Sequence, residues 1–331
     1  MVFDLVLATF LLVGDVGETG EKPSSGACVK ALQSVDLISI ALEFQSLIAL
    51  INLRLTQSYG LESGTTPNRL YAAMKQAVLA GGKRIRGLMI LLAAKDLGLA
   101  EESMMPMALA IEELHAASLI LDDLPSQDDA KLRRGVPSLH LQFDVPTAEL
   151  AAISLLMKGL DLNALGAPFG FEKTLRIQNY WMKLIGHRGL SLGQWMDLHP
   201  EDNPKDVATI EKMIDLKTGR GIEASLWPIF YLAGAPEEKL EKVKELANKM
   251  GRLFQISDDL LDVEGSQKQT GKDSGTDKAN GRVNLVSLLG VAEAKIYRDR
   301  LVAELHVNAR ELLPNSKNFP ILIELIWKRN S

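Results

Sequence analysis

Apolar residues recur every three to four positions from about residue 36 onward, and almost no stretch alternates apolar and polar residues with a period of two. The first spacing is typical of amphipathic helices, and the second of half-buried strands. Glycine, proline and acidic clusters interrupt the helical pattern, as they do at helix ends. The pattern predicts an all-α fold with helices over 37–58, 69–80, 84–97, 103–123, 145–160, 173–197, 207–233, 237–262 and 282–312.

The amino-terminal residues do not follow this pattern. Residues 1–14 are apolar, but no Lys or Arg precedes Lys22, whereas a signal peptide begins with basic residues. At about 1.5 Å per helical residue, the run is too short to span roughly 30 Å of hydrocarbon. Residues 14–27 have the composition of a flexible linker. We expect residues 1–35 to be an extension and linker, either an anchor or transit segment or an extra packing segment, and residues 36–331 to form one domain with no stable membrane span.

Composition narrows the partners and the compartment. The chain has 331 residues, of which 47% are hydrophobic, enough for a large core. Its net charge of -5 gives no overall basic field, so we expect no nucleic-acid partner. The single cysteine, Cys28, excludes an internal disulfide framework and a cysteine metal cluster. We expect a cytoplasmic protein that binds a small ligand.

Carboxylates gather where the helix predicted over 103–123 ends. Asp122 and Asp123 close this helix, and Pro125 cannot continue its hydrogen bonding, so the following loop can bring Asp128 back beside them. His115 lies two turns before Asp122 on the same face. Grouped carboxylates repel one another unless a cation neutralises them. Oxygen ligands with no His or Cys partner indicate a hard ion such as Mg²⁺.

A second cluster ends the helix predicted over 237–262. Asp258 and Asp262 lie one turn apart on one face, next to Asp259. Two acidic ends of the forms DDxxxxD and DDxxD on otherwise apolar helices are hard to explain as solvated surface. Basic residues that could hold a metal-bridged anion accompany them: GGKRIR at 81–86, Arg133, Arg134, Lys217, Lys272 and Arg282. Diphosphate is the anion that fits best.

The motifs GGKRIR, ELHAASLILDDLPSQDDAKLRRG, GQWMDL, KTG, FQISDDLLD and GKDSGTDKANGR occur in this order between residues 81 and 282. In this set the chain resembles the trans-isoprenyl diphosphate synthases, most of all the bacterial geranylgeranyl diphosphate synthases of carotenoid pathways. The resemblance implies the isoprenoid synthase fold, a homodimer, and antiparallel helices around a deep central apolar cavity. It also implies that the two aspartate motifs face each other across the cavity mouth.

The resemblance implies a role for each matching residue. Isopentenyl diphosphate would be held by Lys83, Arg86, His115 and Arg134. About three Mg²⁺ ions per site would be bound by Asp122, Asp123, Asp128 and Asp258, with support from Asp259 and Asp262. The allylic diphosphate would contact Arg133, Lys217 and Lys272. Thr218, Gln194 and Gln255 would line the reacting centre.

Three positions depart from the family pattern. Gly87 stands where the family usually has proline after GGKRxR, a change that could loosen the helix start. Arg282 stands where lysine is usual, which keeps the charge but changes its geometry. AAISLL, at 151–156, lacks the Gly-Asp pair that many members have there.

The implied reaction is head-to-tail condensation of isopentenyl diphosphate with dimethylallyl, geranyl or farnesyl diphosphate. Two alternatives stay open at this point. A class I terpene cyclase also ionises a diphosphate with Mg²⁺, but needs no second diphosphate site such as Lys83 and Arg86 would form. A non-catalytic partner subunit tends to lose aspartates from one motif, whereas both motifs are complete here.

The helix before Asp122 bears on product length. The residues four and five places before Asp122 are Ser118 and Ala117, both small, and in the family a bulky aromatic at this level stops the chain at C15. Each isoprene unit needs about one helical turn, or about 5.4 Å of depth. We therefore expect the cavity floor one turn deeper, at Leu114, and geranylgeranyl diphosphate (C20) as the product. A farnesyl diphosphate synthase (C15) is the alternative.

Overall fold

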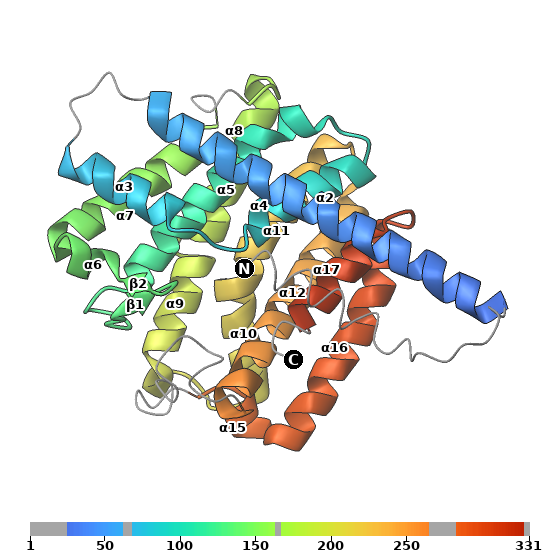
Figure 1. Cartoon of the computed structure of the whole chain (residues 1–331). Helices are drawn as coiled ribbons and strands as arrows, with labels where there is room; N and C mark the ends of the chain where they lie inside the picture. Colours follow the sequence, from blue (N-terminus) through green and yellow to red (C-terminus); the bar gives the residue numbers. More distant parts are fainter. Residues whose placement is uncertain (1–24, 62–67, 163–166, 265–282, 328–331) are drawn as a thin grey trace.

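The computed structural model describes residues 25–61, 68–162, 167–264 and 283–327. Within these ranges the fold is all-α, as predicted, apart from one short hairpin (Figure 1). The larger helices are α2 (Ser25–Leu61), α3 (Arg69–Leu79), α4 (Ile85–Asp96), α5 (Glu101–Asp122), α7 (Val145–Leu160), α8 (Phe171–Ile185), α9 (Leu190–Leu198), α10 (Val207–Ile214), α11 (Arg220–Leu232), α12 (Glu237–Glu264), α16 (Val291–Leu312) and α17 (Asn318–Trp327).

Helix α5 lies inside the bundle, with α4 on one side and α7 on another, and α2 crosses the outside of this group (Figure 1). It is apolar around most of its circumference, as expected of a helix enclosed by others. Gly159 of α7 lets the two backbones approach: a Cβ there would lie 2.7 Å from the Leu114 Cγ and 2.9 Å from the Ala110 carbonyl oxygen. Helices α5 and α7 are therefore closely packed in the middle of α5.

Several helices begin where a side chain accepts a hydrogen bond from a free backbone N–H of the first turn. Asn68 does so for α3, Asp144 for α7 and Asp206 for α10. Asn284 forms a reciprocal capping box with Ser287 at the start of α15 (Leu285–Leu289). These local signals explain why the predicted starts of α3, α7 and α10 agree with the structure within one residue.

Other boundaries differ from the prediction. The segment 173–197 is two helices, because Gly186 and Gly189 end α8 before α9 begins. The segment 207–233 contains a π turn, η2 (Asp215–Gly219), between α10 and α11. The segment 282–312 is α15 followed by α16, separated at Gly290, whose φ is +78°. Helix α2 begins at Ser25 and so includes the last residues of the expected linker.

Four elements were not predicted: the helix α17, the 3-10 turn η1 (Pro200–Asp202), the single turn α6 (Leu139–Gln142), and an antiparallel hairpin of β1 (Leu132–Arg133) and β2 (Val136–Pro137). The strands have two residues each, which is too short for a period to be recognised.

Two described helices, Ile38–Gly60 and Glu101–Asp122, are long and apolar enough to cross a membrane by length and composition. The second is buried over 72% of its apolar window, and the first over 28%. Core helices pass the same test, so this finding is weak evidence for a span.

Candidate active site

The loop after α5 folds back onto the helix end. Asp122 is the last residue of α5, and its carbonyl oxygen accepts a hydrogen bond of 3.0 Å from the Asp128 N–H. The Leu124 carbonyl accepts from the N–H groups of Gln127 and Asp129 at 2.9 and 3.0 Å. The structure thus brings Asp128 beside Asp122, as the sequence predicts.

Asp123 is held by Arg133. The carboxylate is 3% exposed, and Arg133 Nε donates to its two oxygens at 2.9 and 3.1 Å, with a further bond from Arg133 Nη2. Arg133 belongs to β1, so the hairpin places the Arg133 guanidinium beside the end of α5. Two side chains with separate predicted roles, metal binding and allylic diphosphate binding, are therefore joined here in a charge-assisted pair.

Burial raises the pKa of Asp122 to about 6, and the negative charges of Asp128 and Asp123 act in the same direction. Lys217 and Arg133 are close enough to oppose this rise. The charges of these residues act on one carboxylate although they come from three parts of the chain. A carboxylate with a raised pKa is one whose negative charge is incompletely compensated.

The residues predicted to hold isopentenyl diphosphate also act on one another. Burial lowers the pKa of His115 well below its usual value, and the positive charges of Arg86 and Arg134 add to this effect. His115 is therefore neutral near neutral pH and can offer one N–H donor. Burial lowers the pKa of Arg86 as well, while Glu112 and Asp122 oppose the change. Lys83 is exposed at the same loop.

The glycine pair before Lys83 makes room for Arg134. Gly82 has a φ of +126°, and a Cβ on it would lie 2.7 Å from the Arg134 Cζ. Arg134 Nη1 also donates to the carbonyl oxygen of Gly81. The GGKRIR loop and the hairpin after the first aspartate motif are thus in direct contact, which places their exposed cations together.

Sequence reasoning missed the buried pair that supports this loop. Arg84 and Glu112 form an ion pair of 3.3 Å with both side chains 2% exposed. Arg84 also donates to Asn52 Oδ1 at 2.9 Å and to the Val78 carbonyl at 2.7 Å. The N–H of Gly87 donates to Glu112 Oε1 at 3.0 Å. The expected loosening at Gly87 is thus offset by a bond that proline could not make.

The π turn η2 carries Lys217 and Thr218 and packs tightly between two helices. A Cβ at Gly193 of α9 would lie 2.5 Å from the Lys217 N, and one at Gly251 of α12 would lie 2.8 Å from the Gly219 N. Lys217 Nζ reaches Asp197 Oδ2 of α9 at 2.5 Å. π turns are frequent at functional sites, because one extra residue redirects the side chains of a helix.

Arg252 of α12 holds the first residue of this turn. It donates to both carboxylate oxygens of Asp215 at 2.8 and 2.7 Å, and to Glu211 at 2.8 Å. Asp197, Asp215 and Arg252 had no predicted role. Their paired charges fix the backbone that presents Lys217 toward Asp122.

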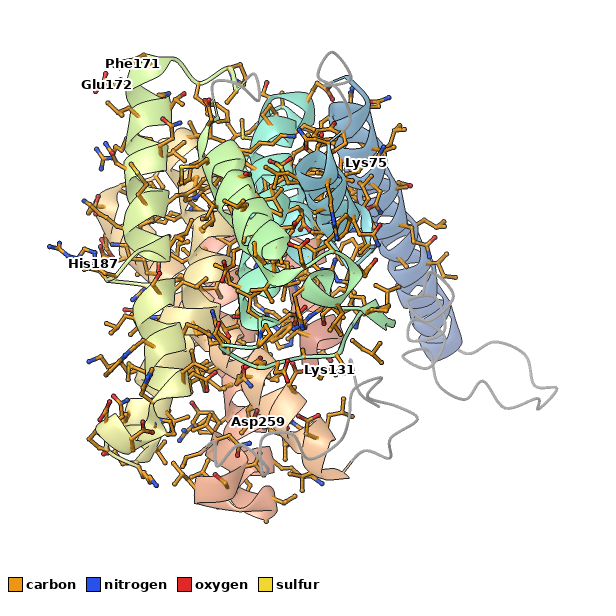
Figure 2. All side chains as sticks on the ribbon, turned by 90° about the vertical axis from the view of Figure 1, so that its left-hand side faces the viewer. Lys75, Lys131, Phe171, Glu172, His187 and Asp259 are labelled. Carbon is orange, nitrogen blue, oxygen red and sulfur yellow. The ribbon has the colours of Figure 1, made fainter. Side chains whose placement is uncertain are left out.

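The second aspartate motif lies on the last two turns of α12. Asp259 is 2% exposed and accepts a hydrogen bond of 2.9 Å from Gln255 Nε2, while Asp258 is partly buried and Asp262 exposed. Figure 2 places Asp259 at the same end of the bundle as Lys131, which follows the first motif. Lys272 and Arg282 lie outside the described residues.

The carboxylates of the first aspartate motif suit a hard cation such as Mg²⁺ that is also bound by the phosphates of a substrate. Asp122 is partly buried, and the negative charge of Asp128 adds to the rise of its pKa, so a divalent cation between the two would offset their repulsion. Among the described residues, no three carboxylate, imidazole or thiol groups stand close enough to form a metal cage alone. Mg²⁺ typically takes one or two carboxylates and completes its octahedron with substrate phosphates and water. The arrangement fits that mode of binding.

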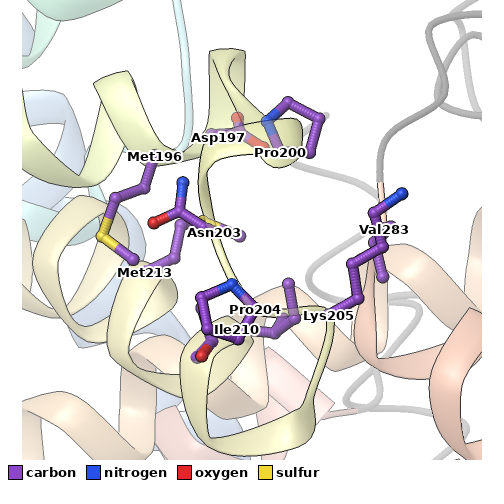
Figure 3. Close-up of a pocket in the computed structure, with 10 residues that line it drawn as sticks. Met196, Asp197, Pro200, Asn203, Pro204, Lys205, Ile210, Met213 and Val283 are labelled. Atoms are coloured by element: carbon purple, nitrogen blue, oxygen red, sulfur yellow. The ribbon is translucent and has the colours of Figure 1, made fainter.

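A bond between two glutamines joins the first motif to α9. Gln194 Nε2 donates to Gln127 Oε1 at 2.7 Å, which ties the DDLPSQD loop to the helix that carries Asp197. A hollow of about 20 Å³ lies on the other side of Asp197, next to Asn203, Met213 and Val283 (Figure 3). It has room for about one water molecule.

The residues predicted to set product length lie on α5. Ala117 is fully buried, Leu114 is 5% exposed and packs against Gly159, and Ser118 Oγ donates to the His115 carbonyl at 2.9 Å. Neither the hollow beside Asp197 nor a second one on the outer surface is lined by these three residues. The deep central cavity therefore stays a prediction.

Known proteins are similar to this chain in both fold and sequence. A farnesyl diphosphate synthase of Micrococcus luteus is 33% identical over 80% of the chain and 90% of its own length. A geranylgeranyl diphosphate synthase of Pantoea ananas is 36% identical over 80% of the chain and 87% of its own length. The structure of a Helicobacter pylori geranyltransferase with magnesium and isoprenyl diphosphate has a TM-score of 0.71 and 29% identity, and covers 86% of this chain and 96% of its own. The sequence model described as polyprenyl synthetase matches residues 67–311, and the chain therefore belongs to the polyprenyl synthetase family.

Proposed function

We propose that this prenyltransferase makes mainly geranylgeranyl diphosphate (C20). As a member of its family it condenses isopentenyl diphosphate with an allylic diphosphate. Relatives named as farnesyl and as geranylgeranyl diphosphate synthases match it about equally well, so the proposed length rests on the residues along α5. The observation that carries the proposal is the closure of α7 onto α5 at Leu114.

Three features support a C20 product. The aspartates hold the allylic head at the end of α5, so the tail runs back along this helix. Ala117 and Ser118 leave no aromatic wall one turn below Asp122. At Leu114, two turns below, the contact with Gly159 leaves no room for even a methyl group. Because burial of each CH₂ is favourable by about 0.8 kcal/mol, a tail fills the depth that is open to it.

The charged residues act on the diphosphates. Lys83, Arg86, His115 and Arg134 bind isopentenyl diphosphate and orient its double bond. Mg²⁺, about three ions that would be held by Asp122, Asp123, Asp128 and Asp258 with Asp259 and Asp262 in support, would supply electrostatic stabilisation of the leaving diphosphate. Lys217 and Arg133 add fixed positive charge at the same place, with Lys272 as a further contact.

The reaction needs no nucleophilic side chain. The allylic C–O bond breaks, the isopentenyl double bond forms the new C–C bond, and the departing diphosphate accepts the proton that is lost. Thr218, Gln194 and Gln255 line the reacting centre. The reacting centre has to exclude water, which would otherwise capture the allylic cation.

Product analysis tests the proposed length. The purified protein is incubated with isopentenyl diphosphate and each of dimethylallyl, geranyl and farnesyl diphosphate, and the products are sized. We expect C20 from all three, mainly C15 from Ala117→Tyr, and C25 or longer from Leu114→Ala. Ala117→Ser, which keeps the side chain small, is the control and should keep C20. A wild-type product of mainly C15, or Ala117→Tyr that still makes C20, would refute the assignment.

We also propose a homodimer formed through α7 and α8. Each helix exposes large apolar side chains on one face, which on a monomer would lie in water: Leu150, Ile153 and Met157 on α7, and Phe171, Leu175 and Met182 on α8. Phe171 is 78% exposed and points away from the bundle in Figure 2. The two helices are in contact, and we propose that their exposed faces act together as one patch.

The oligomeric state is measured by light scattering after size exclusion. Ile153→Lys should convert the dimer to a monomer, because a charge cannot be buried at such a patch without a partner. Val307→Lys, at a 65% exposed position of α16, is the control. A wild-type monomer would contradict this proposal. We propose in addition that the protein acts in the cytoplasm, in a pathway to carotenoids, and pathway complementation tests the second point.

A further inference from the structure

The guanidinium of Arg86 lies against the start of α11, at a residue that has no side chain. A Cβ on Gly221, the second residue of α11, would lie 3.2 Å from the Arg86 Nε, 3.4 Å from its Nη2 and 3.7 Å from its Cζ. The three heavy atoms nearest to this position thus belong to one guanidinium group. Ordinary contacts begin near 3.4 Å, so even a methyl group at residue 221 would press on Arg86.

Within the described ranges, no protein acceptor holds this guanidinium in place. Arg84, Arg133 and Arg134 each donate a hydrogen bond to a carbonyl or carboxylate oxygen. The Arg86 guanidinium donates none to the described residues, and only the longer-range charges of acidic groups act on it. Its N–H donors are therefore open to a ligand, and packing contacts such as the one with Gly221 determine where it lies.

Gly221 is close to residues of both proposed diphosphate sites. It follows Lys217 by four residues, which is about one helical turn. The charge of Lys217 opposes the rise in the pKa of Asp122, and the charge of Asp122 opposes the fall in the pKa of Arg86. The three charged groups are therefore neighbours, and the segment that carries Lys217 also carries the glycine that Arg86 contacts.

The first turn of α11 is fixed on the side away from Arg86. The buried carboxylate of Glu223 accepts hydrogen bonds from Arg220 and from the Tyr180 hydroxyl of α8. At about 100° per residue, Glu223 lies about 200° around the helix from Gly221. An arginine side chain is long and flexible, whereas this backbone is held to α8. A methyl group added at Gly221 would therefore displace the guanidinium and leave the helix where it is.

We propose that Gly221 is a positioning residue for isopentenyl diphosphate. The inference rests on the proposed role of Arg86 in binding that substrate. Because residue 221 has no side chain, the guanidinium can lie against α11 with its N–H groups open to a phosphate. A guanidinium binds two phosphate oxygens at once in a fixed fork geometry, so a shift of a few tenths of an ångström weakens the contact. Gly221 acts through Arg86 and does not itself touch the substrate.

Gly221→Ala tests the proposal, because stability and substrate binding should change in opposite directions. Alanine is favoured over glycine inside a helix, so the midpoint of urea denaturation should stay the same or rise. The KM for isopentenyl diphosphate should rise about three- to tenfold, while the allylic KM and kcat stay within about twofold. A lower midpoint with equal effects on both substrates would show that the glycine serves helix packing alone, and would overturn the proposal.

A double-mutant cycle separates this inference from the role of Arg86. Gly221→Ala added to Arg86→Ala should leave the KM for isopentenyl diphosphate at the value of Arg86→Ala alone, because the effect passes through the guanidinium. Gly60→Ala, in the last turn of α2 with nothing within 4 Å of its added Cβ, is the control and should leave both KM values unchanged.

The two ways of failing give different results. An Arg86→Ala enzyme with an unchanged KM for isopentenyl diphosphate would show that the proposed role of Arg86 is wrong, and the inference with it. If Arg86→Ala raises this KM but Gly221→Ala does not, the role of Arg86 stands and Gly221 is not a positioning residue. The same holds if the two effects multiply in the double variant.

Discussion

Gly251→Ala is the most direct perturbation of the π turn that presents Lys217. The added methyl group would lie 2.8 Å from the Gly219 N and 2.9 Å from the Gly219 Cα, both backbone atoms of η2. Ordinary contacts begin near 3.4 Å, so the turn would have to move by about 0.6 Å.

Two effects of opposite sign can be weighed. Replacing glycine by alanine inside a helix stabilises by about 0.5–1 kcal/mol. Overpacking of a well-filled interior costs about 1–3 kcal/mol. We expect a net loss of about 0.5–2 kcal/mol in the free energy of unfolding. Because a misplacement of about 1 Å can lower a rate about 10²-fold, we also expect kcat to fall about tenfold.

Urea denaturation and steady-state kinetics on the same preparation measure both quantities. Gly60→Ala is the matched control: Gly60 lies in the last turn of α2, and nothing stands within 4 Å of its added Cβ. This variant should be as stable as the wild type or more so, with full activity. If Gly251→Ala behaved like Gly60→Ala, the close contact would not matter and the account of the π turn would be wrong.

Further predictions concern the charges around the site. Glu112→Ala leaves Arg84 buried without its counter-ion and should lower the free energy of unfolding by about 3–5 kcal/mol in urea denaturation; a loss below about 1 kcal/mol would contradict the pairing. The folded-state pKa of Asp122 is about 6 against 3.8, so its charge destabilises the fold fully above pH 6 and not below pH 4. Without Mg²⁺, Asp122→Asn should therefore be more stable at pH 8 by up to about 3 kcal/mol, at about 1.4 kcal/mol per pKa unit, with no difference at pH 3.5; a wild type of equal stability at pH 8 would show that the raised pKa is wrong. Chelation of Mg²⁺ should abolish turnover, and full activity in excess chelator would exclude the metal. Lys83→Ala and Arg86→Ala should raise the KM for isopentenyl diphosphate more than the allylic KM, whereas equal rises would contradict the division of the two sites.

Periodicity was a good guide where a helix has one apolar face and a capping residue. Helix α7 has the predicted bounds, 145–160, because Asp144 caps its start. Periodicity failed where a helix ends but apolar residues continue at helical spacing across the break. Gly186 and Gly189 divide the segment predicted as one helix, yet apolar residues continue at helical intervals on both sides.

At the site, the sequence predicted residues whose charges act on one another, but not the ion pairs that position them. Asp122, Asp128, Arg86 and Lys217 interact as the motifs imply. The partners Glu112, Asp197 and Arg252 are ordinary charged residues in sequence, and only the fold brings them to their counter-ions. Contacts between residues 20 to 37 positions apart have no local signature.

The π turn determines how far α11 is rotated about the helix axis relative to α10. One residue advances a helix by about 100°, so the extra residue in η2 rotates the face of α11 relative to α10 by about that angle. Deletion of one residue from Asp215–Gly219 would make a straighter helix, but would rotate Trp227 and Glu223 out of alignment with α8. Insertions and deletions should therefore be tolerated in the loops around this segment and not within it. The number of residues in η2 determines how the face of α11 is rotated relative to α10.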